Sequence, residues 1–321
     1  MELGLIMPNV RVPAKPYFDF RMSTVKAYAK INLGLRILQK RGDGYHDVET
    51  VFHRVNLFDE ISLEQASSIS FTSTDPNLPA DDSNLCIRAA NLLQQYDDIR
   101  KGARISLVKN IPVGAGLGGG SSDAASTLLG LIELWNIKMP DELLPSVALR
   151  LGSDVPYFLS NGSAYATGRG EVLEYFNLDI PYWIVVAYPN IHVSTAWAYG
   201  AIHDEKFNRH AINHTGPLSI HESSLASRIS LKDFLIKNIQ NPHELNHHLQ
   251  NDFEPVVLHE YGQIGYAKLI LYSEGACFAQ MSGSGSAVYG FFTDEMNATA
   301  AAIKLRALNR VFITPPYFKP E

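Results

Sequence analysis

The sequence predicts an α+β protein with two domains. Strand-type alternation and helix-type periodicity both occur in each half of the 321-residue chain. A chain of this length is more often divided between two cores than folded around one. A glycine-rich run near residue 115 leads directly into an apolar helical pattern, and we take this junction as the feature around which the chain is organised.

The first half begins with two strands joined by a turn. Residues 25–38 alternate apolar and polar side chains, which predicts a strand. Lys30 and Asn32 share one face of it, because side chains two positions apart point the same way. Gly42-Asp43-Gly44 predicts a turn before a second strand. The further elements expected in this half are strands at 48–55, 61–64, 69–72 and 104–108, helices at 84–96, 124–135 and 141–151, and a hairpin at 163–175.

The run VGAGLGGGSSDAA at 113–125 is typical of a phosphate-binding loop. It holds five glycines followed by Ser121 and Ser122, directly before the helical pattern. Glycines allow backbone N–H groups to approach a ligand closely, and the start of a helix favours an anion. Either serine could cap the helix or donate its hydroxyl to the anion.

Three other interpretations of this run are weaker. A Walker loop requires lysine after its closing glycine, where Ser121 stands. The dinucleotide pattern G-x-G-x-x-G matches at Gly114, Gly116 and Gly119, but the region after Trp135 predicts another helix rather than the required strand. A purely structural turn would not need five glycines and two serines at a helix start. We therefore expect a nucleotide loop of a different design.

The second half continues the mixture of strands and helices after a boundary near residues 177–181. Pro189 to Tyr199 predicts a loop and a helix start, and residues 203–230 are polar and rich in histidine, which predicts a long loop. The other expected elements are strands at 182–187 and on both sides of a turn within 281–292, and helices at 231–239, 243–258, 261–274 and 297–308.

Composition narrows the possible classes of protein. The net charge of −6 argues against general nucleic-acid binding, which requires a basic face. The two cysteines, Cys86 and Cys277, lie far apart without metal-ligand spacing and fit a reducing, cytoplasmic compartment. We expect no membrane span, because no apolar run reaches about 18 residues. Residues 1–21 show no core-forming pattern, and we expect them to be a disordered extension.

One motif suggests a metal site. His243-Glu244-Leu245-Asn246-His247 matches H-E-x-x-H, in which two histidines on one helix face bind zinc. Gln250 and Phe253 stand where an extended zinc-protease motif would have glycine and histidine. We interpret the run as a charged helix face and keep a zinc hydrolase centred on His243 and His247 as the alternative.

Four segments in order resemble the GHMP kinases, and the resemblance covers residues 22–311. They are AKINLGLRILQKRGDGYHDVETVF at 29–52, PVGAGLGGGSSDAA at 112–125, LGSDVPYFL at 151–159 and SGSGSAVYGFF at 282–292. Within that family, the Tyr45-His46 pair resembles the branch whose substrate carries a cytidine diphosphate. The resemblance implies a ribosomal-S5-domain-2-like N-terminal domain at 22–178 and a ferredoxin-like C-terminal domain at 179–315, with the site in the cleft between them.

The resemblance also implies the site residues. Tyr45 and His46 would hold the cytosine with Tyr199 stacking from the second domain, and Asn32 and Thr195 would contact the methylerythritol or diphosphate part. Asn84 and Lys109 would flank the adenosine. The phosphates of ATP would lie on Pro112, Val113, Gly114, Ala115, Gly116, Leu117, Gly118, Gly119, Gly120, Ser121 and Ser122.

The implied reaction is the transfer of the γ-phosphoryl group of ATP to the 2-hydroxyl of a cytidine diphosphate methylerythritol, a step of non-mevalonate isoprenoid synthesis. Asp154 would accept the hydroxyl proton, Lys30 would stabilise the phosphoryl charge, and Mg²⁺, with unknown protein ligands, would bridge the β- and γ-phosphates. From its residues alone Asp154 would be an ordinary cap or turn aspartate. We expect a monomer or weak homodimer, and keep a GHMP-fold protein that binds without turnover as a further alternative.

Overall fold

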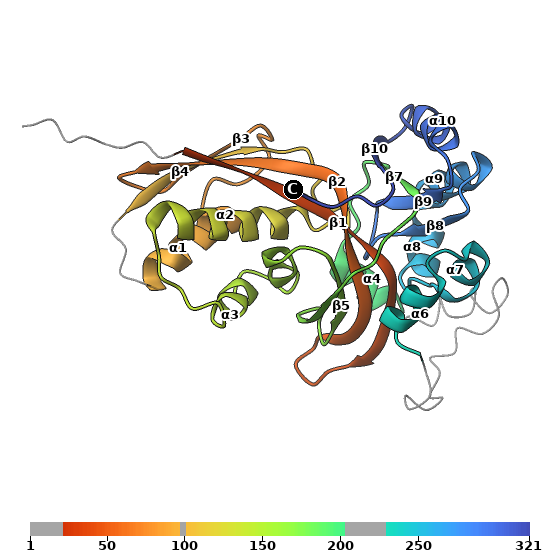
Figure 1. Cartoon of the computed structure of the whole chain (residues 1–321), viewed down its shortest axis with the longest axis horizontal. Coiled ribbons are helices and arrows are strands. Elements are labelled where there is room, and N and C mark those ends of the chain that lie inside the picture. Colours follow the sequence, from red (N-terminus) through yellow and green to blue (C-terminus); the bar gives the residue numbers. More distant parts are fainter. Residues whose placement is uncertain (1–21, 97–100, 203–228) are drawn as a thin grey trace, which may run out of the picture.

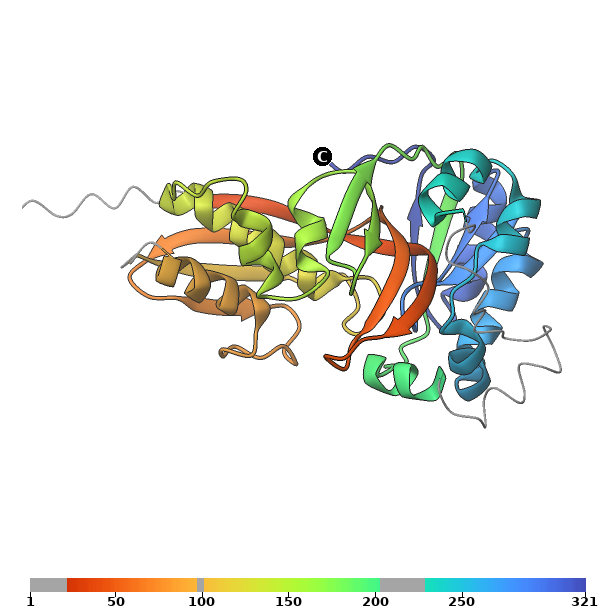
Figure 2. The same cartoon turned by 90° about the horizontal axis from the view of Figure 1, so that it is seen from below.

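The computed structural model describes residues 22–96, 101–202 and 229–321. The expectations for residues 1–21 and for most of the 203–230 loop therefore lie outside the described residues. The chain forms two sheets side by side, with one group of helices on a face of each (Figures 1 and 2). In the described part no helix is both long and apolar enough to cross a membrane.

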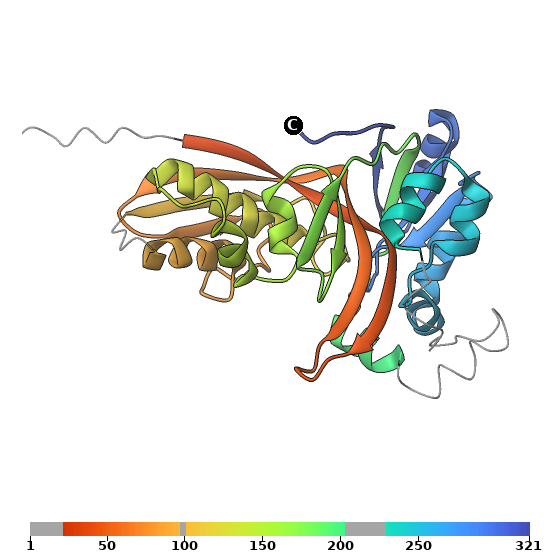
Figure 3. The same cartoon turned by 60° about the horizontal axis from the view of Figure 1, so that its bottom comes forward.

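Two long strands form the frame of the first sheet. β1 (Met22–Lys40) and β2 (His46–Ala66) pair antiparallel, and the predicted turn connects them. One end of β2 pairs with β4 (Gly102–Val108), which also pairs with β3 (Ser70–Ser73), and the other end pairs with β5 (Ser163–Thr167) of the hairpin that continues into β6 (Val172–Phe176). Figure 3 shows the two long strands curving from the first group of helices toward the second sheet.

Helices cover one face of this sheet and complete its core. They are α1 (Leu85–Tyr96), α2 (Gly119–Trp135), the short α3 (Leu144–Leu149) and the 3-10 helix η1 (Val155–Leu159). The alanine- and leucine-rich face of α2 is buried against β1 and β2. A Cβ on Gly130 would lie 2.4 Å from the Leu63 side chain, so the absence of a side chain there sets how closely α2 packs on β2.

The second sheet has the ferredoxin-like order. It consists of β7 (Trp183–Tyr188), β8 (Phe278–Met281), β9 (Val288–Phe292) and β10 (Arg310–Thr314), in the antiparallel order β10-β7-β9-β8. Helices between β7 and β8 and one between β9 and β10 give the expected succession of that fold. They are α4 (Thr195–Ile202), α6 (Leu231–Asn238), α7 (Pro242–His248), α8 (Glu254–Glu260), α9 (Gly262–Ser273) and α10 (Glu295–Leu305).

The two halves share a hydrophobic core. One buried cluster joins Ile31, Leu33 and Val51 of the β1–β2 pair to Tyr289 and Phe291 of β9. The same cluster includes side chains from α6 and α7. Because apolar side chains from both sheets are removed from water together, the position of one half relative to the other is set by packing as well as by chain connection.

Some predicted element boundaries are wrong, and one strand was missed. The expected strands at 48–55 and 61–64 are one continuous strand, since the polar Asp59 between them is buried in an ion pair instead of marking a break. The expected helix at 243–258 is divided into α7 and α8, because the backbone at Leu249 is extended and Asn251 pairs with Leu35. β10 was not expected at all.

His53 provides a test of burial in the first sheet. Its Nδ1 lies 2.8 Å from the Ser163 hydroxyl, and burial lowers the pKa of the imidazole from 6.5 to about 4. The unfolded chain binds the proton first as pH falls, so stability should fall between pH 6.5 and 4. In His53→Gln, the loss of unfolding free energy from pH 7 to pH 5 should be smaller by on the order of 2 kcal/mol, as measured by urea denaturation.

His243→Gln is the matched control, because it removes an exposed histidine on α7 instead of a buried one. Its pH dependence should follow that of the unmodified protein. An unchanged pH dependence in His53→Gln would show that the imidazole is not held neutral by burial.

Candidate active site

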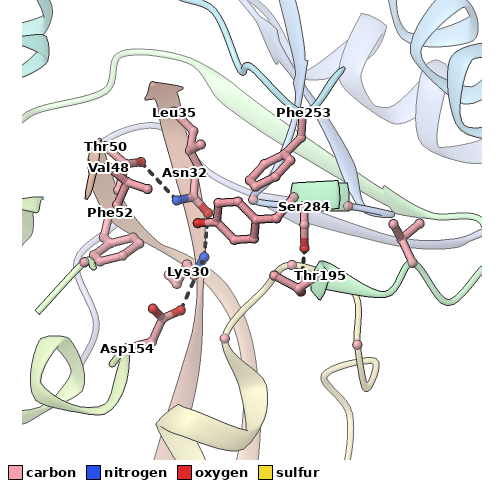
Figure 4. A pocket seen from close by; sticks show the side chains of 18 of the residues that line it. Lys30, Asn32, Leu35, Val48, Thr50, Phe52, Asp154, Thr195, Phe253 and Ser284 are labelled. Carbon is pink, nitrogen blue, oxygen red and sulfur yellow. Dashed lines mark hydrogen bonds and ion pairs between the residues drawn. The ribbon is translucent and has the colours of Figure 1, made fainter. Parts of the chain in front are cut away.

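A cavity of about 340 Å³ lies where the two sheets meet. Side chains from β1 and β2, from Asp154 before η1, and from α4 and the loops of the second half converge on it, together with the backbone of the glycine loop (Figure 4). Most of its lining residues fall within the four segments at 29–52, 112–125, 151–159 and 282–292. They are Lys30, Asn32, Leu35, Val48, Thr50, Phe52, Gly114, Gly116, Gly118, Asp154, Arg169, Gly170, His192, Val193, Ser194, Thr195, Tyr199, Phe253, Gly283, Ser284 and Gly285.

The glycine loop ends in an uncapped helix start. Gly114, Gly116 and Gly118 all have positive φ, between 67° and 78°. α2 begins at Gly119, and its cap residue Gly118 provides no side-chain hydrogen bond. Of the two roles expected for Ser121 or Ser122, capping is wrong, because both lie within the first turn of α2, and donation of a hydroxyl to an anion stays a prediction. The N–H groups of this turn remain suited to an anion.

The loop is fastened to both halves of the molecule. The Leu117 carbonyl accepts a hydrogen bond from the backbone N–H of Lys30 at 2.9 Å. The Ala115 carbonyl accepts one from the N–H of Ala287 at 3.0 Å, and the Gly116 carbonyl accepts one from the Ser282 hydroxyl at 2.9 Å. The backbone approach at Gly116 is so close that a Cβ there would lie 2.2 Å from the Ser282 carbonyl oxygen.

Lys30 and Asp154 meet at the edge of the cavity. A register shift in β1 lies between Tyr28 and Lys30, and the Lys30 ammonium is buried 3.8 Å from an Asp154 carboxylate oxygen (Figure 4). Asp154 precedes η1, but its side chain does not cap that helix, so the interpretation as an ordinary cap is wrong. Burial lowers the pKa of Lys30, and Asp154 opposes that shift.

Asn32 connects Lys30 with the third segment. Its side-chain oxygen accepts a hydrogen bond from the Lys30 ammonium, which confirms that the two side chains share a face of β1. Its Nδ2 donates to the Thr50 hydroxyl at 3.0 Å, and its backbone N–H donates to the Ser282 hydroxyl at 3.1 Å. The Tyr289 hydroxyl donates to the Asn32 carbonyl at 2.9 Å. Asn32 thus fixes the lysine through a hydrogen-bond network that also includes Thr50, Ser282 and Tyr289.

Aromatic rings form one end of the site. His46 stacks on Tyr199, with ring centres 4.7 Å apart and planes 11° apart, and Tyr199 meets Phe253 edge-on at 4.9 Å. Burial and, secondarily, Asp154 raise the pKa of Tyr199. Tyr45 is 56% exposed and lies against the Arg169 guanidinium instead. Of the expected substrate residues, Asn32, Thr195 and Tyr199 line the cavity, His46 touches Tyr199, and Tyr45 lies outside the lining.

Asn84 and Lys109 lie behind the glycine loop, outside the cavity lining. The Asn84 side chain caps α1 by accepting from the Cys86 N–H at 2.9 Å, and its Nδ2 donates to the Pro79 carbonyl. Lys109 is buried between Asp59 and Asp123, at 2.5 and 2.6 Å. Neither side chain is free toward the cavity in this arrangement.

Lys109, Asp59 and Asp123 form a buried charged cluster that contacts the start of the glycine loop. Asp59 accepts hydrogen bonds from the N–H groups of Asn110 and Ile111, which fixes the start of the loop. Burial, opposed by Lys109 but aided by Asp59, raises the pKa of Asp123 to about 8. The cluster holds two carboxylates against one buried ammonium, so burial disfavours the second negative charge.

Several lining residues were not found from the sequence. Phe52 lies under the Lys30 ammonium, with its ring centre 4.9 Å from Nζ, and Ser284 exchanges a hydrogen bond with Thr195 at 2.9 Å. Phe52 and Ser284 lie within the first and last of the four segments, at 29–52 and 282–292, and this position could have identified them as candidates. Arg169 stands between two glycines of a predicted turn. No pattern in the sequence pointed to His192.

The H-E-x-x-H run does not form a metal centre in this structure. His243 and His247 stack 4.2 Å apart on α7, and the Nδ1 of His247 donates to the His243 carbonyl. Across residues 22–96, 101–202 and 229–321, no group of three histidine, cysteine, aspartate or glutamate side chains is placed to hold a metal ion. The geometry fits the charged helix face, and no finding supports the zinc hydrolase.

Comparisons with known proteins agree with this geometry. The model of the GHMP kinase N-terminal domain matches residues 84–162, and that of the GHMP kinase C-terminal domain matches residues 231–310. A 4-diphosphocytidyl-2-C-methyl-D-erythritol kinase from Prosthecochloris aestuarii is 45% identical over 92% of this chain and 98% of its own, and one from Chlorobaculum tepidum is 41% identical over 93% and 99%.

Solved structures give the same result. A crystal structure of a 4-(cytidine 5'-diphospho)-2C-methyl-D-erythritol kinase is 32% identical, covers 91% of this chain and 98% of its own, and has a TM-score of 0.74. A Leishmania major mevalonate kinase, 16% identical over 94% and 98%, has a TM-score of 0.66 and shows the fold alone. The fold is that of a GHMP kinase, and the chain belongs, within this class, to the family of the 4-diphosphocytidyl-2-C-methyl-D-erythritol kinases.

The close approach at Gly116 generates a stability prediction. Gly116→Ala would place a Cβ against the Ser282 backbone at a positive φ, so the unfolding free energy should fall by roughly 2–4 kcal/mol. Urea denaturation measures the change.

Gly120→Ala is the matched control within the same loop-helix junction. Gly120 lies in the first turn of α2, and the nearest atom to its Cβ position is 3.7 Å away. The unfolding free energy should therefore stay the same or rise slightly, because alanine favours a helix. Equal stability of the two variants would show that the loop is not packed against Ser282.

Proposed function

We propose that the protein transfers the γ-phosphoryl group of ATP to the 2-hydroxyl of 4-diphosphocytidyl-2-C-methyl-D-erythritol. The observation that carries the proposal is the Lys30–Asp154 pair, held 3.8 Å apart beside an uncapped glycine loop. A buried ammonium beside a carboxylate provides a fixed positive charge for the transferred phosphoryl group and an acceptor for the hydroxyl proton. The relatives' names supply the identity of the substrate.

The residues of the loop fit the phosphates of ATP, the co-substrate. Three glycines with positive φ and a helix start without a side-chain cap leave backbone N–H groups available to an anion. Residues 112–122 would hold the phosphates. Asn84 and Lys109 would act from behind the loop, since their polar atoms are engaged there and Asp59 links Lys109 to the amides of residues 110 and 111.

Mg²⁺ would be held chiefly by the phosphates and water. Asp154 is the one carboxylate among the described residues that line the cavity, and it already faces Lys30. A single protein oxygen suits Mg²⁺, which keeps several waters and binds with substrate phosphates. Bound in this way it would neutralise charge on the transferring group.

The chain's own groups then have defined roles. Asp154 is 35% exposed to the cavity, so its carboxylate can accept the proton of the 2-hydroxyl. The Lys30 ammonium, fixed by Asn32 and lying over Phe52, stabilises the charge on the transferring phosphoryl oxygens. Phosphoryl transfer has a loose transition state, so fixed charge and position provide most of the acceleration.

The aromatic end of the cavity would take the cytosine. His46 and Tyr199 form a stacked pair of rings there, and Tyr45 lies against Arg169 at the adjacent turn. Asn32 and Thr195, on opposite sides of the cavity, would contact the methylerythritol or the diphosphate. In this proposed order the reacting hydroxyl would lie at the Lys30–Asp154 pair.

Substrate choice tests the proposed function. The protein should consume ATP with 4-diphosphocytidyl-2-C-methyl-D-erythritol and not with galactose, homoserine or mevalonate. A site whose buried polar groups are built to pair with a base rejects analogues that leave those groups unpaired. A coupled ADP-release assay measures turnover, and comparable rates with mevalonate would contradict the assignment.

The catalytic pair gives a second test. Asp154→Asn keeps the side-chain shape and removes its charge, and Lys30→Met removes the ammonium while keeping an unbranched side chain. Each should lower kcat by roughly 10² or more, while ATP affinity measured by calorimetry persists through the backbone of the loop. The double variant should lose less than the product of both factors, because the two groups act together.

Stability separates catalysis from folding in this test. Burial lowers the pKa of Lys30, so holding the ammonium charged costs folding free energy at neutral pH. Lys30→Met should therefore be at least as stable as the unmodified protein. Near-normal kcat in Asp154→Asn would remove Asp154 from the mechanism.

A further inference from the structure

Arg169 occupies a fixed position at the rim of the cavity. It stands at the turn between β5 and β6, between Gly168 and Gly170, whose φ values are 66° and 106°. The Gly168 carbonyl accepts a hydrogen bond from the Val48 N–H at 2.7 Å, which ties the turn to β2. Arg169 and Lys30 are the arginine and lysine side chains among the described residues that line the cavity.

The guanidinium of Arg169 has unused hydrogen-bonding capacity. Its Cζ lies 4.9 Å from the centre of the Tyr45 ring, and its Nε is 3.5 Å from a Glu171 carboxylate oxygen. Nη1 and Nη2 have no hydrogen-bond partner in the described segments of the chain. The side chain is 28% exposed. These two nitrogens carry donors in the geometry that phosphate oxygens accept.

Arg169 also lies between the two ends of the proposed substrate site. On one side it contacts Tyr45 at the base end. On the other side, a Cβ on the neighbouring Gly170 would lie 3.8 Å from an Asp154 carboxylate oxygen. A substrate that joins a base to the reacting alcohol through a diphosphate must pass its phosphates between these ends, and Lys30 is already bound to Asn32 and paired with Asp154.

We propose that Arg169 binds the diphosphate of the nucleotide-linked substrate and discriminates in favour of it. This proposal rests on the function proposed above, because it takes the base end and the reacting end from it. The guanidinium stacks on Tyr45 while its terminal nitrogens bind phosphate oxygens. Glu171 holds the Arg169 backbone N–H at 2.5 Å and thereby fixes the turn.

The competing role for Arg169 is support of the Tyr45 ring alone. The two roles differ in which part of the ligand loses affinity when the charge is removed. A phosphate-binding arginine affects cytidine 5'-diphosphate and leaves cytidine unaffected, whereas a ring support affects both equally. Cytidine and cytidine 5'-diphosphate are therefore the probes.

The experiment measures binding of both probes to the full chain with the glycine loop saturated by a non-hydrolysable ATP analogue. Calorimetry gives the diphosphate affinity, and ligand-observed NMR gives the weaker cytidine affinity. Arg169→Gln should weaken cytidine 5'-diphosphate roughly tenfold or more and cytidine less than about twofold. Arg169→Lys, which keeps the charge, should recover part of the loss. In turnover, Arg169→Gln should raise KM by a similar factor with kcat changed less than about threefold.

Arg41→Gln is the matched control. Arg41 lies at the nearby turn, pairs with Asp43 and Asp47 at 3.1 and 2.8 Å, and does not line the cavity. It should leave both affinities unchanged. Equal losses of both probes in Arg169→Gln, or no loss of either, would overturn the proposal, as would a loss of the same size in Arg41→Gln.

Failure of the proposed function gives a different result. If the unmodified protein binds cytidine 5'-diphosphate through Arg169 but does not phosphorylate the methylerythritol substrate, the reaction is wrong and the phosphate contact stands. If it turns over that substrate while Arg169→Gln binds both probes normally, the contact is wrong and the reaction stands. Absence of cytidine 5'-diphosphate binding to the unmodified protein overturns both.

Discussion

The contact between the glycine loop and the Ser282 backbone is the constraint on which the site depends. Gly116 belongs to the first sheet's half of the molecule and Ser282 to the second, and their backbones lie too close for a Cβ between them. The Ser282 hydroxyl binds both the Gly116 carbonyl and the Asn32 N–H. Three segments separated by up to 250 residues are thereby held at one point, and the loop, the lysine and the second half take their relative positions from it.

Burial of the Lys30 ammonium costs folding free energy. An ammonium removed from water is costly unless it is paired and hydrogen-bonded. Asn32, Asp154 and the ring of Phe52 provide those partners, yet burial still lowers the pKa of the ammonium. The free energy gained by burying apolar side chains in the shared core of the two halves offsets this remaining cost. Ile31 and Leu33 of the same strand belong to that core.

Local chemistry in the sequence predicted part of this site, and long-range contacts determined the rest. The glycine run and the shared face of Lys30 and Asn32 follow from residue type and strand periodicity alone. Asp154 could not be placed opposite Lys30 in that way, because the pair forms only after the strand and η1 have folded together; the family resemblance supplied it. The break between α7 and α8 depends on Asn251, whose Nδ2 donates to the Met281 and Gly283 carbonyls, and no local pattern predicts such a partner.

Because β2 is one continuous strand, it connects two distant parts of the site directly. His46 stands at one end of this strand, and Asp59, which fixes the first amides of the glycine loop, stands toward the other. β1 pairs with this strand along most of its length, and the Asn56 N–H donates a hydrogen bond to the Thr314 hydroxyl of β10. The separation between His46 and the first amides of the glycine loop is therefore set along one continuous, paired strand and not across a flexible joint.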